Sequence, residues 1–147
     1  MRTTLADTGL LVALLSLRDK HHAWAVNLVA GMRPPFLTCE AVLSEAAYLT
    51  RKQTGGDQLM GLVREGFVRP TFRLSEEAAA VQSLLKRYAS VSMDLADACL
   101  VRMSEMHPDC VVLTIGSEFR DVYRRRGRQV IPCVLPPGVD SRRRKKT

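Results

Sequence analysis

The sequence predicts a three-layer α/β fold, in which a mostly parallel central sheet is covered by helices on both faces. Short apolar segments of strand length alternate along the chain with longer segments whose apolar residues recur at helical spacing. The candidate strands are apolar almost throughout, which is typical of strands that are buried on both faces. With 147 residues, the chain has the length of a single domain with one hydrophobic core.

The expected elements follow one another without an internal repeat or a linker through residues 1–135, which we take as the domain. Strands are expected at residues 3–6, 36–38, 68–72, 111–114 and 130–134. Helices are expected at residues 8–17, 20–32, 40–52, 57–65, 75–88 and 94–106. Thr38 and Ser75 are expected to cap two helices, and Gly55 and Gly56 to end the helix that Thr38 begins. Residues 136–147 are expected to form a disordered basic tail.

The net charge of +7 is concentrated toward the C-terminus. A cluster of arginines lies between two expected strands, where the backbone should be ordered: Arg124, Arg125, Arg126 and Arg128. Such a cluster suits a polyanionic partner, because each neutralised phosphate releases condensed counterions. The second basic run, Arg142 to Lys146, is equally well explained as a solvated tail that keeps the protein soluble.

The cysteines and the N-terminal segment bear on the cellular compartment. The four cysteines stand singly among apolar residues, which favours buried thiols in a reducing cytoplasm over disulfides or zinc ligands. The apolar run Leu10 to Leu17 loosely imitates a secretion signal, but Asp7 precedes it and Arg18-Asp19-Lys20 follow at once. The run is also too short to span a bilayer. We therefore expect a cytoplasmic protein with no membrane contact.

Asp7 and Glu45 are the first two candidates for a functional site. Asp7 follows the first expected strand, and in open α/β sheets the ligand crevice lies at the carboxyl ends of the strands. Capping of the next helix is the alternative role of Asp7, and for this residue taken alone it is the favoured one. Glu45 lies near Val42 and Leu49 on the apolar stripe of its helix, so we expect a buried carboxylate. Such a carboxylate needs a cation nearby, either a metal ion or an arginine.

Asp94 and Asp97 open a helix that is apolar on nearly every side. Their spacing of three places them on the same face, where two negative charges disfavour joint ionisation unless a cation lies between them. Stabilisation by the helix dipole is the alternative, and it explains Asp94 better than Asp97. Several acids that converge in a protein of net charge +7 suggest a cation site. Oxygen ligands without histidine or cysteine favour Mg²⁺ or Mn²⁺.

The chain resembles the PIN-domain ribonucleases, and especially the VapC-like toxins of bacterial toxin–antitoxin pairs. The resemblance covers about residues 3–135 and rests on the order and spacing of short motifs. These motifs are Leu5 to Leu10, Leu43 to Ala47, Met93 to Ala98, and Val112 to Thr114 followed by Phe119 and Tyr123-Arg124.

The resemblance implies a PIN-like fold and hydrolysis of RNA phosphodiester bonds. It implies that Asp7, Glu45 and Asp97 are metal ligands, with Asp94 beside them, and that the metal is Mg²⁺ or Mn²⁺. Thr8 and Thr114 are then candidates for the hydroxyl groups next to these ligands.

One departure from the family pattern concerns the segment after Thr114. The family usually has one further residue and then an aspartate, whereas here Ile115 is followed by Gly116. Ser117 and Glu118 come next, so the longer Glu118 side chain is a possible replacement ligand. Without it, the site loses one negative ligand, and a domain that binds RNA or a protein without cutting becomes the alternative function.

The resemblance also implies partners. These are RNA, a small antitoxin that covers the acidic crevice, and a second copy of the chain in a homodimer, since many relatives self-associate. Tyr123 and Arg124 could stack on single-stranded RNA, and a packing role for Tyr123 is equally well supported.

Two other enzyme classes are disfavoured. Asp7-Thr8-Gly9 also matches the active-site triplet of aspartic proteases, but those sites lie in all-β surroundings, whereas residues 10–17 favour a helix. The chain contains neither of the glycine-rich phosphate-binding motifs of nucleotide-binding enzymes.

Overall fold

The computed structural model describes residues 2–53 and 55–139, and in these residues it confirms the three-layer α/β fold. The central sheet has five strands in the order β3-β2-β1-β4-β7, and every neighbouring pair is parallel. The strands are β1 (Thr4–Ala6), β2 (Phe36–Thr38), β3 (Val68–Pro70), β4 (Val111–Leu113) and β7 (Cys133–Val134). Strands β1 and β4 are distant in sequence but are neighbours in the middle of the sheet.

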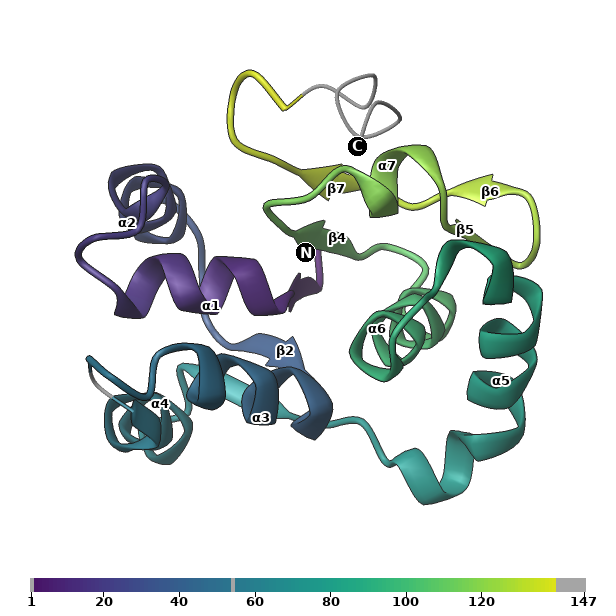
Figure 1. Cartoon of the computed structure of the whole chain (residues 1–147), viewed down its shortest axis with the longest axis horizontal. Helices are drawn as coiled ribbons and strands as arrows, with labels where there is room; N and C mark the ends of the chain where they lie inside the picture. Colours follow the sequence, from purple (N-terminus) through teal and green to yellow (C-terminus); the bar gives the residue numbers. More distant parts are fainter. Residues whose placement is uncertain (1, 54, 140–147) are drawn as a thin grey trace.

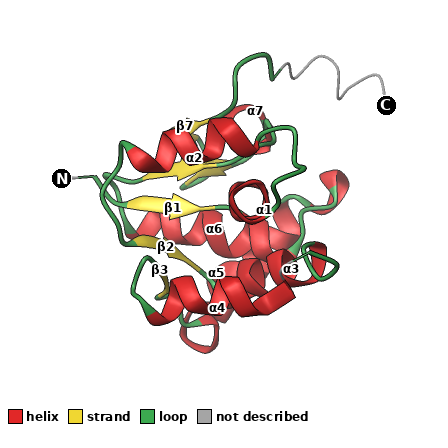
Figure 2. Ribbon diagram, turned by 90° about the vertical axis from the view of Figure 1, so that its left-hand side faces the viewer, coloured by secondary structure: helices red, strands yellow, loops and turns green. Residues whose placement is uncertain are grey.

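Each of the six expected helices is present, with ends that differ from the expected ones by up to three residues. They are α1 (Thr8–Leu15), α2 (His22–Ala30), α3 (Glu40–Leu49), α4 (Gly55–Arg64), α5 (Leu74–Arg87) and α6 (Leu95–Met106). Two short helical segments were not expected, namely the 3-10 turn η1 (Ala89–Val91) and α7 (Glu118–Asp121). Figure 1 shows α1 and α2 on one side of the strands and α5 and α6 on the other. Figure 2 shows the strands lying between helices.

The core is built on β1 and β4, whose residues are all buried. Leu5 lies between Leu37 of β2 and Val112 of β4 in the sheet register and is fully buried. Full burial of a leucine side chain contributes about 1.5–3 kcal/mol relative to an exposed one. The apolar runs that predicted these strands are therefore explained by burial on both faces.

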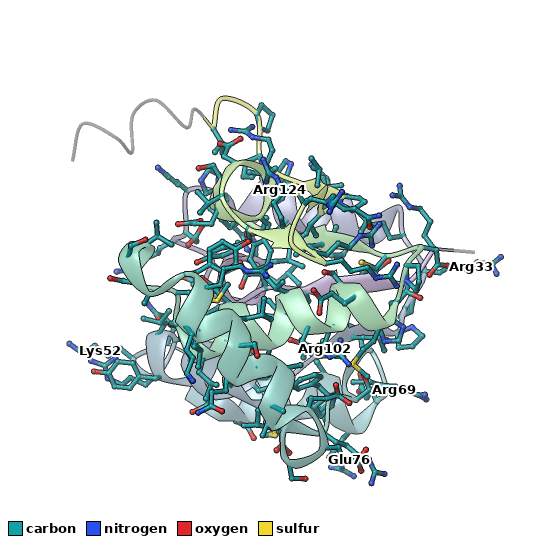
Figure 3. The ribbon with its side chains drawn as sticks, turned by 90° about the vertical axis from the view of Figure 1, so that its right-hand side faces the viewer. Arg33, Lys52, Arg69, Glu76, Arg102 and Arg124 are labelled. Atoms are coloured by element: carbon teal, nitrogen blue, oxygen red, sulfur yellow. The ribbon has the colours of Figure 1, made fainter. Side chains whose placement is uncertain are left out.

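Helix α6 is the main helix of its layer and packs on β1 and against α5. Seven of its twelve residues are buried, so it is apolar on nearly every side. An ion pair secures it to α5, since Arg102 Nε lies 2.7 Å from Glu77 Oε1. Figure 3 shows Arg102 on the side where α5 covers α6.

The expected caps of α3 and α5 are wrong. The Thr38 hydroxyl donates to the Ala6 carbonyl at 2.8 Å and so joins β2 to β1, which leaves Cys39 as the N-cap of α3. Ser75 lies inside the first turn of α5, whose N-cap is Arg73. Gly55 and the residue after it begin α4 instead of ending α3. The Thr38 side chain is engaged by a neighbouring strand, and Ser75 and Gly55 lie at other helix positions than their residue types favour. Local residue preference therefore did not decide these helix ends.

The expected strand at residues 130–134 is divided in two. Strand β6 (Gln129–Val130) pairs antiparallel with β5 (Arg124–Arg125), whereas β7 pairs parallel with β4. Pro132 stands between them and cannot donate a ladder hydrogen bond, and Ile131 is fully buried. The β5–β6 turn includes Arg126 and Gly127, both with positive φ.

The expected C-terminal tail and the expected lack of a membrane span concern the remaining parts of the chain. Residues 140–147, most of the expected tail, lie outside the described residues. Among the described residues, no helix combines the length and the apolar character that a membrane span requires.

Gly9 is predicted to be required by close packing at the start of α1. A Cβ atom at Gly9 would lie 2.8 Å from Ile115 Cγ1 and 3.0 Å from Ile115 Cβ. These atoms belong to a β-branched side chain next to the backbone, which cannot swing away. We expect Gly9→Ala to lower the free energy of unfolding by about 1–3 kcal/mol, measured by urea denaturation.

Gly61, within α4, is the matched control. A Cβ atom at Gly61 would meet nothing within 4 Å. Gly61→Ala should therefore raise the free energy of unfolding by about 0.5–1 kcal/mol, because alanine is the better helix former. A loss of stability of the same size in both variants would contradict the packing explanation for Gly9.

Candidate active site

The candidate site lies where the central strands β1 and β4 end. Asp7 directly follows β1, and its backbone N–H donates to the Leu113 carbonyl of β4 at 3.0 Å. Thr114 directly follows β4, and its hydroxyl donates to Asp7 Oδ2 at 2.6 Å. The other oxygen, Asp7 Oδ1, accepts from the Thr8 backbone N–H at 2.7 Å and caps α1. Both roles considered for Asp7 are thus compatible, since it caps a helix and also lies at the carboxyl edge of the sheet.

Glu45 is not the buried carboxylate that the helix pattern predicted. Helix α3 buries Val42, Leu43 and Ala46, whereas Glu45 is exposed. Tyr48 and Leu49, its neighbours on the next turn, are 61% and 52% exposed. The apolar stripe therefore extends beyond the packed face of the helix.

The Glu45 side chain is nevertheless held at the site. The Thr8 hydroxyl donates to Glu45 Oε1 at 2.7 Å. The hydrogen-bond partner that the structure shows for Glu45 is thus a neutral hydroxyl group and not the arginine considered from the sequence.

Asp94 and Asp97 come from the start of α6. Asp94 is exposed and is the N-cap of the helix, with its Oδ1 accepting from the Asp97 backbone N–H at 2.8 Å. Asp97 is half-buried, as expected from its apolar neighbours on the next turn. Its Oδ2 accepts from the Tyr123 hydroxyl at 2.8 Å. Capping thus accounts for Asp94 more fully than for Asp97.

The four carboxylates lie close enough to influence each other's ionisation. Burial raises the pKa of Asp7 above its usual range, and the negative charges of Asp94 and Glu45 raise it further. Burial, followed by the charge of Asp7, raises the pKa of Asp97 to about 7. The charges that contribute most to these shifts are all carboxylates, and no salt bridge to these four side chains is found among the described residues.

The donor set fits a hard divalent cation. All four side chains offer carboxylate oxygens, which Mg²⁺ and Mn²⁺ prefer, and a cation would relieve their mutual repulsion. Within residues 2–53 and 55–139, no three His, Cys, Asp or Glu side chains already lie at metal-binding distances. Glu45 and Asp94 are exposed, whereas Asp7 and Asp97 are half-buried, so the set has an open side from which a cation could enter.

A shallow groove leads to these residues between α3 and the start of α6. It has a volume of about 500 Å³ and is lined by Ala41, Ser44, Glu45, Tyr48, Asp94, Leu95 and Ala96. Two of the four carboxylates thus face a surface that a polymeric substrate can reach.

Ser117 and Glu118 lie in the segment that departs from the family pattern. Ser117 is buried at the N-cap position of α7, and Glu118 is the first residue of that helix and half-buried. Gly116 precedes them and is also half-buried. The role of Glu118 as a replacement ligand stays a prediction.

Tyr123 is the residue whose role the sequence did not reveal. Its side chain is only 3% exposed and packs edge-on against Tyr88 and Phe119, with ring centroids 5.3 Å apart in each pair. It is therefore unavailable for stacking on RNA, and of the two roles considered the packing role is the one observed. Its hydrogen bond to Asp97 spans 26 positions, and no local motif signals such a contact.

The arginines of the β5–β6 hairpin divide into two kinds. Arg124 is half-buried and donates from Nη1 to the carbonyls of Arg120 and Tyr123, and Figure 3 shows it beside α7. Arg125 is also half-buried and donates to the Ser104 carbonyl. Arg126 and Arg128 are exposed.

Comparison with known proteins assigns the family. The model of the PIN domain matches residues 4–125, a segment that includes all four carboxylates. The chain belongs to the PIN-domain family. One solved structure similar to this PIN domain is VapC20 from Mycobacterium tuberculosis, described as a sarcin-ricin loop cleaving toxin. The TM-score is 0.63, with 20% identity over 75% of this chain and 87% of that chain, a likeness that concerns the fold. Among curated proteins, no match was found.

Burial of Asp97, together with the carboxylates around it, predicts a pH-dependent cost to the stability of the metal-free PIN domain. The pKa of Asp97 is about 7 in the folded protein against an ordinary value of 3.8. Between these values the folded protein binds more protons than the unfolded chain, so the free energy of unfolding falls as the pH rises. Asp97→Asn keeps an acceptor for Tyr123 and removes the charge. We expect it to raise the melting temperature at pH 8 by about 3–6 °C, a gain on the order of 1 kcal/mol.

Thermal unfolding in the presence of a chelator at several pH values checks this expectation. The difference between Asp97→Asn and the wild type should shrink as the pH falls toward 4, where the Asp97 carboxyl group is neutral in the folded protein and close to the midpoint of its titration in the unfolded chain. A difference that is constant over pH 4–8 would contradict the ionisation of Asp97 as its cause.

Proposed function

We propose that this PIN domain is a divalent-metal-dependent endoribonuclease, and specifically a VapC-like toxin. The observation that carries the proposal is the convergence of Asp7, Glu45, Asp94 and Asp97 at the carboxyl ends of β1 and β4 in a protein of net charge +7. Family membership and the likeness to the fold of a toxin that cleaves the sarcin-ricin loop support it.

In this proposal, Asp7, Glu45 and Asp97 hold Mg²⁺ or Mn²⁺, with Asp94 beside them. The bound metal would supply a Lewis acid for the phosphoryl oxygen and a water molecule of lowered pKa. Thr114 fixes Asp7, and Thr8 fixes Glu45, each through a hydroxyl hydrogen bond. Asp94 caps α6 and keeps Asp97 at the start of the helix.

The exposed arginines of the hairpin are proposed to contact RNA phosphates. Arg126 and Arg128 are exposed, whereas Arg124 and Arg125 direct their side chains to backbone carbonyl groups. We therefore assign contact with the RNA mainly to Arg126 and Arg128. The second pair, which also belongs to the cluster identified from the sequence, acts mainly by holding the hairpin.

The proposed partners are those of a toxin in the cytoplasm. An antitoxin would cover the acidic crevice, and a homodimer is a further possibility. Co-purification with the product of the neighbouring gene tests the first, and size-exclusion chromatography with light scattering tests the second.

A domain that binds RNA or a protein without cutting is the alternative function. The observation that favours it is Gly116, which stands where the family usually has an aspartate and offers no side-chain oxygen. The two functions differ in whether the purified protein breaks a phosphodiester bond.

Cleavage of RNA by the purified protein tests the proposal. We expect cleavage with Mg²⁺ or Mn²⁺ of a panel that includes a sarcin-ricin loop hairpin, and loss of cleavage with EDTA. Asp7→Asn should reduce the rate by at least about 100-fold, because it removes one negative charge from the metal ligands. Identical product patterns from the wild type and Asp7→Asn would favour the binding-only alternative.

The salt dependence of RNA binding tests the two exposed arginines. Each lost phosphate contact on single-stranded RNA reduces the slope of log K against log salt by about 0.7. The double variant Arg126→Gln/Arg128→Gln should therefore reduce the slope by about 1.4, measured by fluorescence anisotropy with EDTA present. Arg33→Gln is the control, since Arg33 is exposed but lies next to Pro34 and Thr4 in a different groove. An equal change in the control would contradict a specific role for the hairpin.

A further inference from the structure

Three carboxylates of the site share one feature, which is a hydrogen bond from a neutral hydroxyl group. Thr114 donates to Asp7 at 2.6 Å, Thr8 donates to Glu45 at 2.7 Å, and Tyr123 donates to Asp97 at 2.8 Å. Thr8 is next to Asp7 in sequence, and Thr114 follows β4 at the same level as Asp7 follows β1. Tyr123 is not next to a ligand in sequence, and it comes from the segment between α7 and β5.

A neutral donor has a different consequence from a cationic one. A lysine or arginine at the same distance would orient a carboxylate but would also neutralise it and compete with a metal ion. A hydroxyl group fixes the direction of the carboxylate and leaves its full negative charge. Tyr123 engages Oδ2 of Asp97 and so sets the direction in which Oδ1 points.

The position of the Tyr123 hydroxyl is itself fixed by packing. Its ring meets Phe119 at an interplanar angle of 81° and Tyr88 at 72°. Tyr88 is in turn held by its hydroxyl oxygen, which accepts from the Arg124 backbone N–H at 2.9 Å. Tyr123 therefore has little freedom to turn away from Asp97.

We propose that Tyr123 is a positioning residue that presents Asp97 to the metal ion. This inference rests on the proposed metal site, and it adds a residue that lies outside the carboxylate set. Loss of a hydrogen bond that orients a metal ligand typically weakens metal binding by about 10–100-fold.

The test compares two phenol-to-phenyl substitutions in the same aromatic cluster. Tyr123→Phe removes the hydroxyl that contacts Asp97, and Tyr88→Phe removes the hydroxyl that contacts the Arg124 backbone. Both lose one partly buried hydrogen bond, so both should unfold at a lower temperature than the wild type. Only Tyr123→Phe is expected to weaken Mn²⁺ binding, by about tenfold or more, measured by electron paramagnetic resonance without RNA.

Two results would overturn the positioning role. The first is wild-type Mn²⁺ affinity in a folded Tyr123→Phe protein. The second is an equal loss of affinity in Tyr88→Phe, which would mean that packing alone matters. If Tyr123→Phe does not fold, addition of Asp97→Asn serves as the second measurement. That substitution removes the repulsion and should restore folding, and the double variant should then bind Mn²⁺ no more weakly than Asp97→Asn alone.

The same measurements separate this inference from the proposed function. A wild-type protein that binds no Mn²⁺ overturns both. A wild-type protein that binds Mn²⁺ but cuts no RNA overturns the nuclease, and a selective loss of affinity in Tyr123→Phe would still support the positioning role.

Discussion

The structure depends on holding several carboxylates together, and none of them forms an ion pair with a lysine or arginine among residues 2–53 and 55–139. Like charges at short range repel, and burial of Asp7 and Asp97 makes ionisation costlier still. Three hydroxyl groups meet this requirement, because they orient the oxygens without cancelling their charge. The crowded carboxylates lower the stability of the folded protein, and packing elsewhere in the fold must offset this cost, as is common for functional sites.

The parallel sheet supplies that support through its strand order. Because β1 and β4 are neighbours, Asp7 and Thr114 follow adjacent strands and are brought into contact across 107 positions. Helix α6 begins at the same edge and is anchored by seven buried residues and by its ion pair to α5. The acidic residues therefore lie next to well-buried elements of the core, and a groove beside them reaches the surface.

The last part of the chain links the site to the basic hairpin. Tyr123 contacts Asp97, and the next residue, Arg124, is bound through its backbone to Tyr88 and through its side chain to nearby carbonyl groups. The turn that carries Arg126 and Arg128 is thus attached to the same aromatic cluster that orients Asp97. The proposed RNA-contacting turn and the proposed metal ligand Asp97 are therefore linked through neighbouring residues of one segment.

The fold class, and the place of two aspartates at element boundaries, could be predicted from the residue pattern. Apolar runs predicted the buried strands, and the place of Asp7 and Asp94 at helix starts follows from local capping chemistry. The contacts of Glu45 with Thr8 and of Tyr123 with Asp97 could not be predicted, because they join residues 37 and 26 positions apart. The division of residues 130–134 into two strands likewise depends on which neighbours are available, β5 on one side of Pro132 and β4 on the other. Periodicity and capping are local properties, whereas these contacts arise when distant segments meet.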